Sequence, residues 1–284
     1  MDYYLVIPIH NEEAFLKSTL DSILLQTILP KKVILVNDNS TDDTENIIDL
    51  YIARNPIFTK VNSVSSTQHM PGSKVVDAFN KGLKELDDNF NFIVKLDADL
   101  ILPNNYFEVI SLHFKLNQNL GICGGFIYEQ KESGDWVLNH PMDKDHVRGA
   151  IKAYSKACFK AIGGLKSAMG WDTVDELLAK YHGFEIQTDS SLKIKHLRPT
   201  GKAYNNKAKR LQGKAMYTMR YGFLITCIAS LKMALKNKSI ASFSNNIFGY
   251  LNAAKNSATY LVTKEEGDFI RNLRWTNIKR KIKA

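Results

Sequence analysis

Two carboxylates stand one residue apart directly after an apolar run of the chain. The run is 92–96, and the acids are Asp97 and Asp99 in the triplet Asp97-Ala98-Asp99. Carboxylate oxygens bind hard divalent cations such as Mg²⁺ or Mn²⁺, which complete their shell with water and substrate phosphates. A solvated turn is the alternative for an isolated pair. The position after a buried strand favours the metal site.

Two further polar clusters follow short β-branched runs. His10-Asn11-Glu12-Glu13 follows 4–9, which contains Pro8, and Asn37-Asp38-Asn39-Ser40 follows 33–36. In open parallel sheets, ligands bind beyond the carboxyl ends of the strands, so three such clusters indicate one site. Asp38 at this position can hydrogen-bond a base or a ribose. An Asx turn that leads into the next helix is the structural alternative, and both can hold together.

A fourth polar group follows the glycines at 163–164. It is the segment Trp171-Asp172-Thr173-Val174-Asp175-Glu176. Trp171 suits one wall of a sugar-binding site, and Asp172 or Asp175 is a possible general base for an acceptor hydroxyl. The alternative is an ordinary helix start, with the first aspartate near the N-cap.

Three isolated residues carry weaker signals. Lys74 and Arg148 are possible phosphate partners, although a single cation is usually surface charge. His196 follows a predicted strand at 191–194. It is a metal-ligand candidate only if the fold brings it to Asp99.

The elements that must position these residues alternate between strands and helices. Strands are predicted at 4–9, 33–36 and 92–96, and helices at 14–27, 41–51 and 74–86. This order predicts an α/β fold with a mostly parallel sheet and helices on both faces.

The pattern changes towards the C-terminus. From about residue 208, apolar residues recur every four positions and predict helix with one broad apolar stripe; they are Leu211, Ala215, Met219, Phe223, Cys227, Leu231 and Leu235. We therefore predict a sheet-containing domain over 1–205 and a basic helical region over 206–284.

Charge divides the chain at nearly the same point. The whole chain has 38 Lys+Arg against 29 Asp+Glu, a net charge of +9, with a pI near 9.2. Residues 1–199 hold 21 basic and 26 acidic side chains, whereas 200–284 hold 17 basic and 3 acidic. The basic excess permits nucleic-acid binding. No nucleic-acid motif accompanies it, so no nucleic-acid partner is expected.

Cysteine usage and the apolar segments bear on the compartment. The 3 cysteines are scattered without metal-ligand spacing, which is typical of a reducing compartment. The N-terminus lacks the basic region of a signal peptide. The apolar stretch 223–231 is far shorter than the ~20 residues of a membrane-spanning helix. We predict a cytoplasmic protein, either soluble or peripherally attached to the inner face of the cytoplasmic membrane.

Taken together, the segments resemble the family 2 glycosyltransferases, which have the GT-A fold. The resemblance covers about residues 1–200; the matching segments are 8–13, 36–44, 78–82, 97–99, 163–164 and 171–176. It implies a nucleotide-sugar donor with UDP or GDP, a divalent cation (Mn²⁺ or Mg²⁺), and inverting transfer to a hydroxyl of a glycan or lipid-linked acceptor. Bacterial cell-surface polysaccharide or lipopolysaccharide synthesis is the expected setting.

The resemblance also implies roles for individual residues. Nucleotide and donor binding would fall to seven residues: Pro8, His10, Glu12, Asp38, Lys74, Asp97 and Arg148. The metal would be held by Asp99, with Asp97 and His196, and Trp171 would contact the acceptor. The family's base is the second acid of a pair that precedes a glycine by eleven residues, and Asp172 has this spacing to Gly183. Trp171 replaces the first acid, so Asp175 stays a second candidate.

Other classes remain open. A nucleotidyltransferase would need a glycine-rich basic loop after the first strand, where His10-Asn11-Glu12-Glu13 stands instead. A basic nucleic-acid-binding protein and an inactive, binding-only relative are further alternatives. For the basic C-terminal region, contact with an anionic membrane surface and packing as a helical layer with a solvated basic face both stay possible.

Overall fold

The computed structural model describes residues 1–65, 72–139, 146–198 and 206–283. These residues divide into two compact units. The first comprises 1–69, 74–165 and 182–200, and the second comprises 70–73, 166–181 and 201–284. The segment 166–181 therefore groups with the C-terminal helices, which periodicity alone does not indicate.

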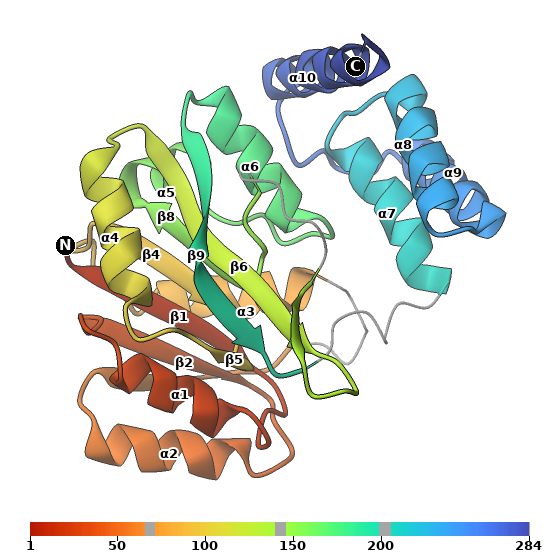
Figure 1. Ribbon diagram of the computed structural model, residues 1–284. Helices are drawn as coiled ribbons and strands as arrows, with labels where there is room; N and C mark the ends of the chain where they lie inside the picture. The colour runs from red at the N-terminus through yellow and green to blue at the C-terminus, as the bar shows by residue number, and fades with distance from the viewer. Residues whose placement is uncertain (66–71, 140–145, 199–205, 284) are drawn as a thin grey trace. The chain divides into compact units, whose positions relative to one another are not determined.

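Four parallel strands form the first half of the sheet (Figure 1). Their order is β3-β2-β1-β4, and their bounds are β1 Tyr3–Ile9, β2 Lys32–Asp38, β3 Phe58–Ser63 and β4 Phe92–Leu96. The three central strands are almost wholly buried, which explains their near-continuous apolar runs. The predicted strands at 4–9, 33–36 and 92–96 are thus confirmed, while β3 was not predicted.

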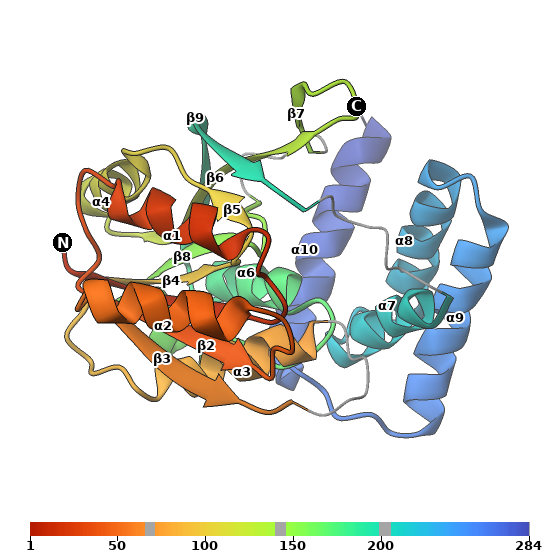
Figure 2. The same cartoon turned by 90° about the horizontal axis from the view of Figure 1, so that it is seen from below.

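Helices connect these strands, as parallel pairing requires. They are α1 Leu16–Leu24, α2 Thr44–Arg54 and α3 Ser73–Leu83. In Figures 1 and 2, α1 and α2 lie side by side along the sheet. α1 and α2 each start a few residues after a polar cluster, so these two clusters sit in the loops that leave the carboxyl ends of β1 and β2.

The second half of the sheet mixes directions. β8 Ile151–Ser155 runs antiparallel to β4, and the order continues as β8-β6-β9-β5. The remaining elements are β5 Leu100–Ile101, α4 Tyr106–Leu116, β6 Leu120–Gln130, β7 Trp136–Leu138, α5 Lys156–Ala161 and β9 Glu185–His196. The long strands β6 and β9 run parallel across the sheet. Their pairing carries the end of β9 to β5, directly after Asp99.

The second unit is helical. It contains α6 Trp171–Tyr181, α7 Asn206–Thr218, α8 Phe223–Lys236, α9 Ile240–Lys255 and α10 Lys264–Lys283. The predicted continuous stripe from 211 to 235 is wrong, because α7 ends at Thr218 and α8 begins at Phe223. Gly222 between them adopts a φ of 77°, a left-handed conformation that favours glycine. A repeat of four also drifts around a helix that has 3.6 residues per turn.

Helices α7, α8 and α9 pack through small or polar side chains. The buried residues of α8 include Thr226, Ser230 and Ala234, and those of α9 include Ser242 and Ala253. α7 and α9 approach so closely at Gly213 that a Cβ there would lie 1.9 Å from the Asn246 carbonyl oxygen. Such close approach of backbones needs small residues at the crossing.

Large apolar side chains of these helices face outwards instead. Leu224, Ile228, Leu231 and Leu235 follow one face of α8 and are between 41% and 71% exposed. The usual arrangement of a helix in a globular protein buries such a stripe. None of the described helices combines the length and apolarity that crossing a membrane requires.

Candidate active site

A pocket of about 270 Å³ opens at the carboxyl ends of β1, β2 and β4. Seven of the residues that line it were singled out from the sequence: Pro8, His10, Glu12, Asp38, Lys74, Asp97 and Asp99. Ile9, Ser65, Val75, Ala78 and Ala98 complete the lining. The structure therefore brings the three predicted polar clusters together in one cavity.

The loops after β1 and β2 are tied to each other by hydrogen bonds. The Asn11 carboxamide oxygen accepts from the Thr41 backbone N–H at 2.8 Å, and the Ser40 hydroxyl accepts from the Asn11 N–H at 3.1 Å. Asn11 and Asn39 both have a positive φ, at 53° and 58°, which asparagine tolerates better than most residues. These contacts fix the positions of the side chains that the loops present to the pocket.

Asp38 and His10 are held by the same loops. One Asp38 carboxylate oxygen accepts from the Ser65 N–H at 2.9 Å, and its side chain is buried. The His10 Nδ1 lies 2.7 Å from the Asp38 carbonyl oxygen, so Nδ1 carries the proton and donates.

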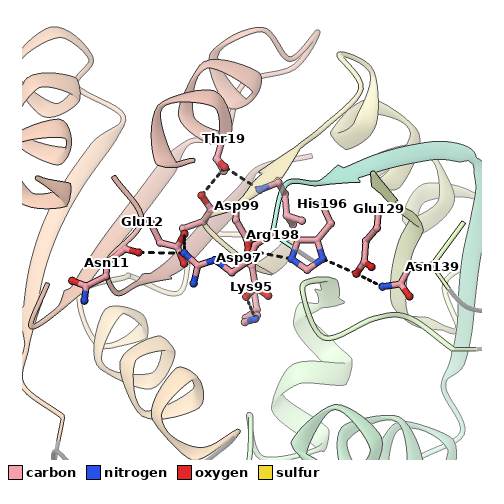
Figure 3. A network of polar contacts seen from close by, with 12 residues as sticks. Asn11, Glu12, Thr19, Lys95, Asp97, Asp99, Glu129, Asn139, His196 and Arg198 are labelled. Atoms are coloured by element: carbon pink, nitrogen blue, oxygen red, sulfur yellow. Dashed lines mark hydrogen bonds and ion pairs between the residues drawn. The ribbon is translucent and has the colours of Figure 1, made fainter. Parts of the chain in front are cut away.

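Asp97 is paired with a buried lysine of its own strand. The Lys95 ammonium contacts the Asp97 carboxylate and donates to the Gly149 carbonyl oxygen at 3.0 Å (Figure 3). Lys95 is 2% exposed, so its charge is largely removed from water. A buried ammonium is tolerated only with close partners, and Asp97 is one of them.

Asp99 lies beside His196, as the metal-ligand interpretation of that histidine required. β5 pairs with β9 so that Leu100 stands opposite His196, and the His196 Nε2 lies 3.1 Å from one Asp99 carboxylate oxygen. Both side chains are more than nine-tenths buried. The other Asp99 oxygen is buried and has no hydrogen-bond partner among the described residues.

Glu129 stands on the far side of His196. Its carboxylate lies 3.6 Å from the His196 Nδ1 and also accepts from the Asn139 carboxamide. Burial alone would lower the pKa of His196, but the hydrogen bond to Asp99 and the surrounding carboxylates raise it above the ordinary value. Glu129 thus helps to orient the imidazole, as carboxylates behind metal-bound histidines do.

Thr19 shapes the turn that carries the two aspartates. Its buried hydroxyl donates to the Ala98 carbonyl oxygen at 2.7 Å and accepts from the Leu100 N–H at 3.0 Å. The hydroxyl therefore satisfies both backbone groups that flank Asp99. Helix α1 fixes the turn of the metal-site candidate in this way (Figure 3).

Glu12 is the acid of the pocket whose pKa is strongly raised. Burial first, and then the charge of Asp99, raise the pKa of Glu12 to about 8, against the lowering effect of Arg198. The Arg198 guanidinium donates to the Glu12 carboxylate at 2.7 Å. Arg198 follows β9 and thereby joins the end of that strand to the loop after β1.

These residues fit a divalent cation in part. The unpartnered Asp99 oxygen offers one ligand atom at the pocket, and the His196 Nε2, which lies 3.1 Å from the other Asp99 oxygen, could add a second only once it has lost its proton. Within the described residues no group of three or more histidine, cysteine or acidic side chains is arranged to hold an ion. Such a site suits Mg²⁺ or Mn²⁺ whose remaining ligands are water and substrate phosphates.

Four sequence-predicted residues lie elsewhere. Arg148 precedes β8 and is not among the described residues that line the pocket; its carbonyl accepts from the Ile151 N–H. Trp171 begins α6, in the second unit, so it is a helix residue rather than a loop residue. Asp172 and Asp175 follow it on the same helix, one turn apart, and Asp175 is 1% exposed whereas Asp172 is half-buried.

Sequence reasoning missed four residues that support the pocket. They are Thr19, Lys95, Glu129 and Arg198. Lys95 gave a local signal, because a lysine inside an otherwise apolar buried strand needs a partner. The other three are joined to the site only by tertiary structure.

Comparison with known proteins defines the class. Residues 4–168 match Glycosyl transferase family 2, which is more than half of the chain, and the chain belongs to this family. The resemblance stated from the motifs is therefore confirmed.

Curated relatives are similar over part of their length. An uncharacterized glycosyltransferase of Mycoplasma genitalium is 27% identical over 59% of this chain and 57% of its own length. The minor teichoic acid biosynthesis protein GgaB of Bacillus subtilis is 32% identical over 42% of this chain and 12% of its own. The poly-β-1,6-N-acetyl-D-glucosamine synthase of Staphylococcus epidermidis is 27% identical over 41% and 26%. The chain thus spans less than two thirds of each of these relatives.

Solved structures share the fold. Staphylococcus aureus TarS 1-349 in complex with UDP-GlcNAc has a TM-score of 0.59 at 15% identity, over 98% of this chain and 92% of that one. The mannosyltransferase PcManGT of Pyrobaculum calidifontis, in complex with GDP-Man and Mn²⁺, has a TM-score of 0.58 at 14% identity, over 97% and 80%. The predicted GT-A-type α/β fold with C-terminal helices is confirmed.

We predict that Glu12→Gln changes how stability depends on pH. In the unfolded chain Glu12 loses its proton near its ordinary pKa of 4.5, whereas in the folded protein it keeps that proton up to about pH 8. The folded state binds more protons in this window, so the residue makes the free energy of unfolding fall as pH rises, by at most ~1.4 kcal/mol per pH unit. In Glu12→Gln the free energy of unfolding does not fall with pH for this reason. Its melting temperature should exceed that of the wild type by a growing margin from pH 5 to pH 8, measured with a chelator present.

The exposed Glu132 provides the matched control, because Glu132→Gln removes the same charge from the surface. A margin between wild type and Glu12→Gln that stays constant with pH would contradict the raised pKa.

Proposed function

We propose that this protein transfers a sugar from a nucleotide-sugar donor to a hydroxyl acceptor, with inversion, in the synthesis of a bacterial cell-surface polysaccharide. One observation carries the proposal: six polar or charged side chains meet in the pocket at the strand ends, namely His10, Glu12, Asp38, Lys74, Asp97 and Asp99. The family membership supports the class of reaction, and the pocket is the proposed site where the donor binds.

The nucleoside would occupy the side of the pocket formed by the loops after β1 and β2. Asp38 and His10 offer hydrogen-bonding atoms for a base and ribose, and Pro8 forms an apolar wall. Lys74, on α3, would face the diphosphate. The names of the structural neighbours, which bind UDP-GlcNAc and GDP-Man, support UDP or GDP as the nucleotide.

Asp99 and His196 would hold the divalent cation, with Asp97 on the donor side. A bound Mn²⁺ or Mg²⁺ supplies positive charge that stabilises the diphosphate as it leaves. Mn²⁺ in the neighbouring mannosyltransferase structure supports this choice. The protein's own contribution is to keep the Asp99 carboxylate buried and oriented through Thr19 and His196.

The base would come from α6. Asp172 has the family's spacing to Gly183 and is more accessible than the buried Asp175, which favours Asp172 for contact with an acceptor. The base takes the proton of the acceptor hydroxyl while that oxygen attacks the anomeric carbon. Trp171, the neighbouring residue on α6, would contact the acceptor, and Arg148 would interact with the donor.

The setting is proposed from the names of the relatives and from the second unit. Teichoic acid and poly-N-acetylglucosamine synthesis are the named roles of curated relatives. The exposed leucines of α8, with Phe248 and Leu251 exposed on α9, lie in the region of 17 basic and 3 acidic residues. An apolar face among basic side chains fits an anionic membrane surface, so we place the enzyme at the inner face of the cytoplasmic membrane.

The donor reaction tests the function directly. We expect one nucleotide sugar of a UDP- and GDP-linked panel to release nucleoside diphosphate with Mn²⁺ or Mg²⁺, in the presence of a bacterial membrane fraction as acceptor source. Asp99→Asn should lower this rate at least 10²-fold, because the cation loses a ligand, and should weaken Mn²⁺ binding measured by electron paramagnetic resonance. Release from no donor by the folded protein would contradict the enzyme proposal.

The assignment of the base is tested by two neighbouring variants. Asp172→Asn should reduce transfer by about 10²–10⁴-fold, since proton removal from the acceptor is lost. Nucleotide binding, measured by calorimetry, should stay within a few-fold of wild type. Asp175→Asn is the comparison, and wild-type turnover in Asp172→Asn together with loss in Asp175→Asn would assign the base to Asp175.

Membrane contact is tested by vesicle sedimentation. Leu231→Ser with Leu235→Ser should weaken binding to phosphatidylglycerol vesicles at low salt by about tenfold or more, because two exposed leucines no longer enter the interface. Leu112→Ser with Leu116→Ser, which alters two exposed leucines of α4 in the first unit, is the matched control. Equal binding by both double variants, or no binding by the wild type, would contradict the membrane contact.

A further inference from the structure

The second unit contains a larger pocket, whose lining includes Gly170 and Thr173 on either side of Trp171 and Asp172. It has a volume of about 480 Å³ and is lined mainly by α7, α8, α10 and the link between α7 and α8. This volume lies within the roughly 300–1,000 Å³ of small-molecule sites in proteins. All of its lining residues belong to the second unit, so the pocket is complete there.

The inner wall of this pocket is apolar and adaptable. Met216, Met219 and Ile225 line it and are each at most 3% exposed, and the half-buried Met233 adds a further thioether. Methionine side chains are flexible and polarisable, and they occur at surfaces that accept aliphatic ligands of variable shape. The wall therefore suits a hydrocarbon chain.

The outer part of the pocket is basic. Lys232, Lys236 and Lys281 line it and are exposed, and Arg274 is half-buried. None of the described lining residues is acidic. Four cations around an apolar cavity without a carboxylate favour a ligand that has an anionic head and an apolar body.

Arg274 is oriented for such a head group. Its guanidinium donates to the Tyr221 hydroxyl at 2.5 Å and lies over the same ring at 5.0 Å from the centroid. Its Nε atom is buried and has no hydrogen-bond partner among the described residues. Buried donors are nearly always satisfied in folded proteins, so the Nε of this pocket-lining arginine is a donor that still needs an acceptor.

The pocket also meets the exposed apolar face of α8. Ile228 belongs both to that face and to the lining, and Lys232 lies one turn further along the helix. If a lipid layer lies against the α8 face, a hydrocarbon chain of one lipid could pass these two residues and reach the methionine wall. The lysines along this route would then stay close to the phosphate of the same lipid.

We propose that this pocket binds one anionic membrane lipid, with an aliphatic chain against the methionines and a phosphate held by Arg274 and the lysines. The inference rests on the membrane contact proposed above, and it gives that contact a specific ligand. A free phosphate ion would leave the apolar wall in contact with water. A neutral lipid would leave the cations without a counter-charge.

Soluble single-chain phosphates test the pocket without a membrane. Calorimetry on the full chain would compare decyl phosphate, octyl phosphate, inorganic phosphate and decyl maltoside, each below its micelle concentration. We expect decyl phosphate to bind roughly tenfold more tightly than octyl phosphate, since each buried methylene adds about a fourfold gain. Affinity for inorganic phosphate equal to that for decyl phosphate, or independence from chain length, would overturn the proposal.

Variants of the pocket identify the site. Ala229→Trp fills it and should abolish decyl phosphate binding, and Met233→Glu should weaken binding by placing a negative charge on the wall. Lys232→Ser with Lys236→Ser should cost about fivefold per lysine. Lys214→Ser with Lys255→Ser removes two exposed lysines that do not line the pocket and should leave the affinity unchanged.

The variants also separate this proposal from the proposed function. Donor-dependent release of nucleoside diphosphate should persist in Met233→Glu. Weakened binding of decyl phosphate together with unchanged release of nucleoside diphosphate would identify a separate lipid site. Circular dichroism melts establish that each variant is folded, and if Ala229→Trp does not fold, Met233→Glu decides the result. Wild-type affinity for decyl phosphate in the folded pocket variants would overturn the proposal.

Discussion

The need to hold the carboxylates of Glu12, Asp97 and Asp99 in one pocket, beside the buried Asp38, governs the arrangement of the first unit. The side chains of Glu12 and Asp99 are largely removed from water, whereas that of Asp97 is 33% exposed, and an unpaired buried charge would be costly. Each therefore has a basic partner from another position in the fold: Arg198, Lys95 and His196. Compensation is incomplete, as the raised pKa of Glu12 and the unpartnered oxygen of Asp99 indicate. This residual negative potential suits the divalent cation that we propose, and a bound cation would in turn attract a diphosphate.

This constraint explains why the sheet changes direction after β4. Two of the three basic partners, His196 and Arg198, come from the end of β9, far along the chain from the acids. The long parallel pairing of β6 and β9, followed by the short pair of β5 and β9, brings that end beside Asp99. Thr19 then fixes the intervening turn through two backbone hydrogen bonds. The mixed half of the sheet thus supplies counter-charges, while the parallel half presents the acids.

The sequence allowed the acids to be located but not the groups that compensate them. Polar clusters after β-branched runs mark strand ends, and strand ends of a parallel sheet meet at one edge, so Asp38 and Asp99 could be placed together in advance. His196 needed the family resemblance, and Arg198 had no signal, because strand pairing across almost 100 intervening residues decides their positions. In the C-terminal region, the helices were predicted correctly but their apolar stripe was not, for another reason. Its four-residue repeat suggested one buried stripe, but Gly222 interrupts the helix and the large side chains of α8 face outwards.

That outward arrangement changes how the basic C-terminal region is understood. A helical layer that only covered a domain would bury its leucines and expose its serines and asparagines. α8 and α9 do the reverse, with Ser230 and Asn246 inside and Leu231 and Leu235 outside. Small residues at the closest crossings let these helices pack tightly, and the outward leucines of α8 are then free for another apolar surface. Because lysines border that face and line the adjoining pocket, an anionic apolar surface would match both features, and the membrane of anionic lipids that we propose is such a surface.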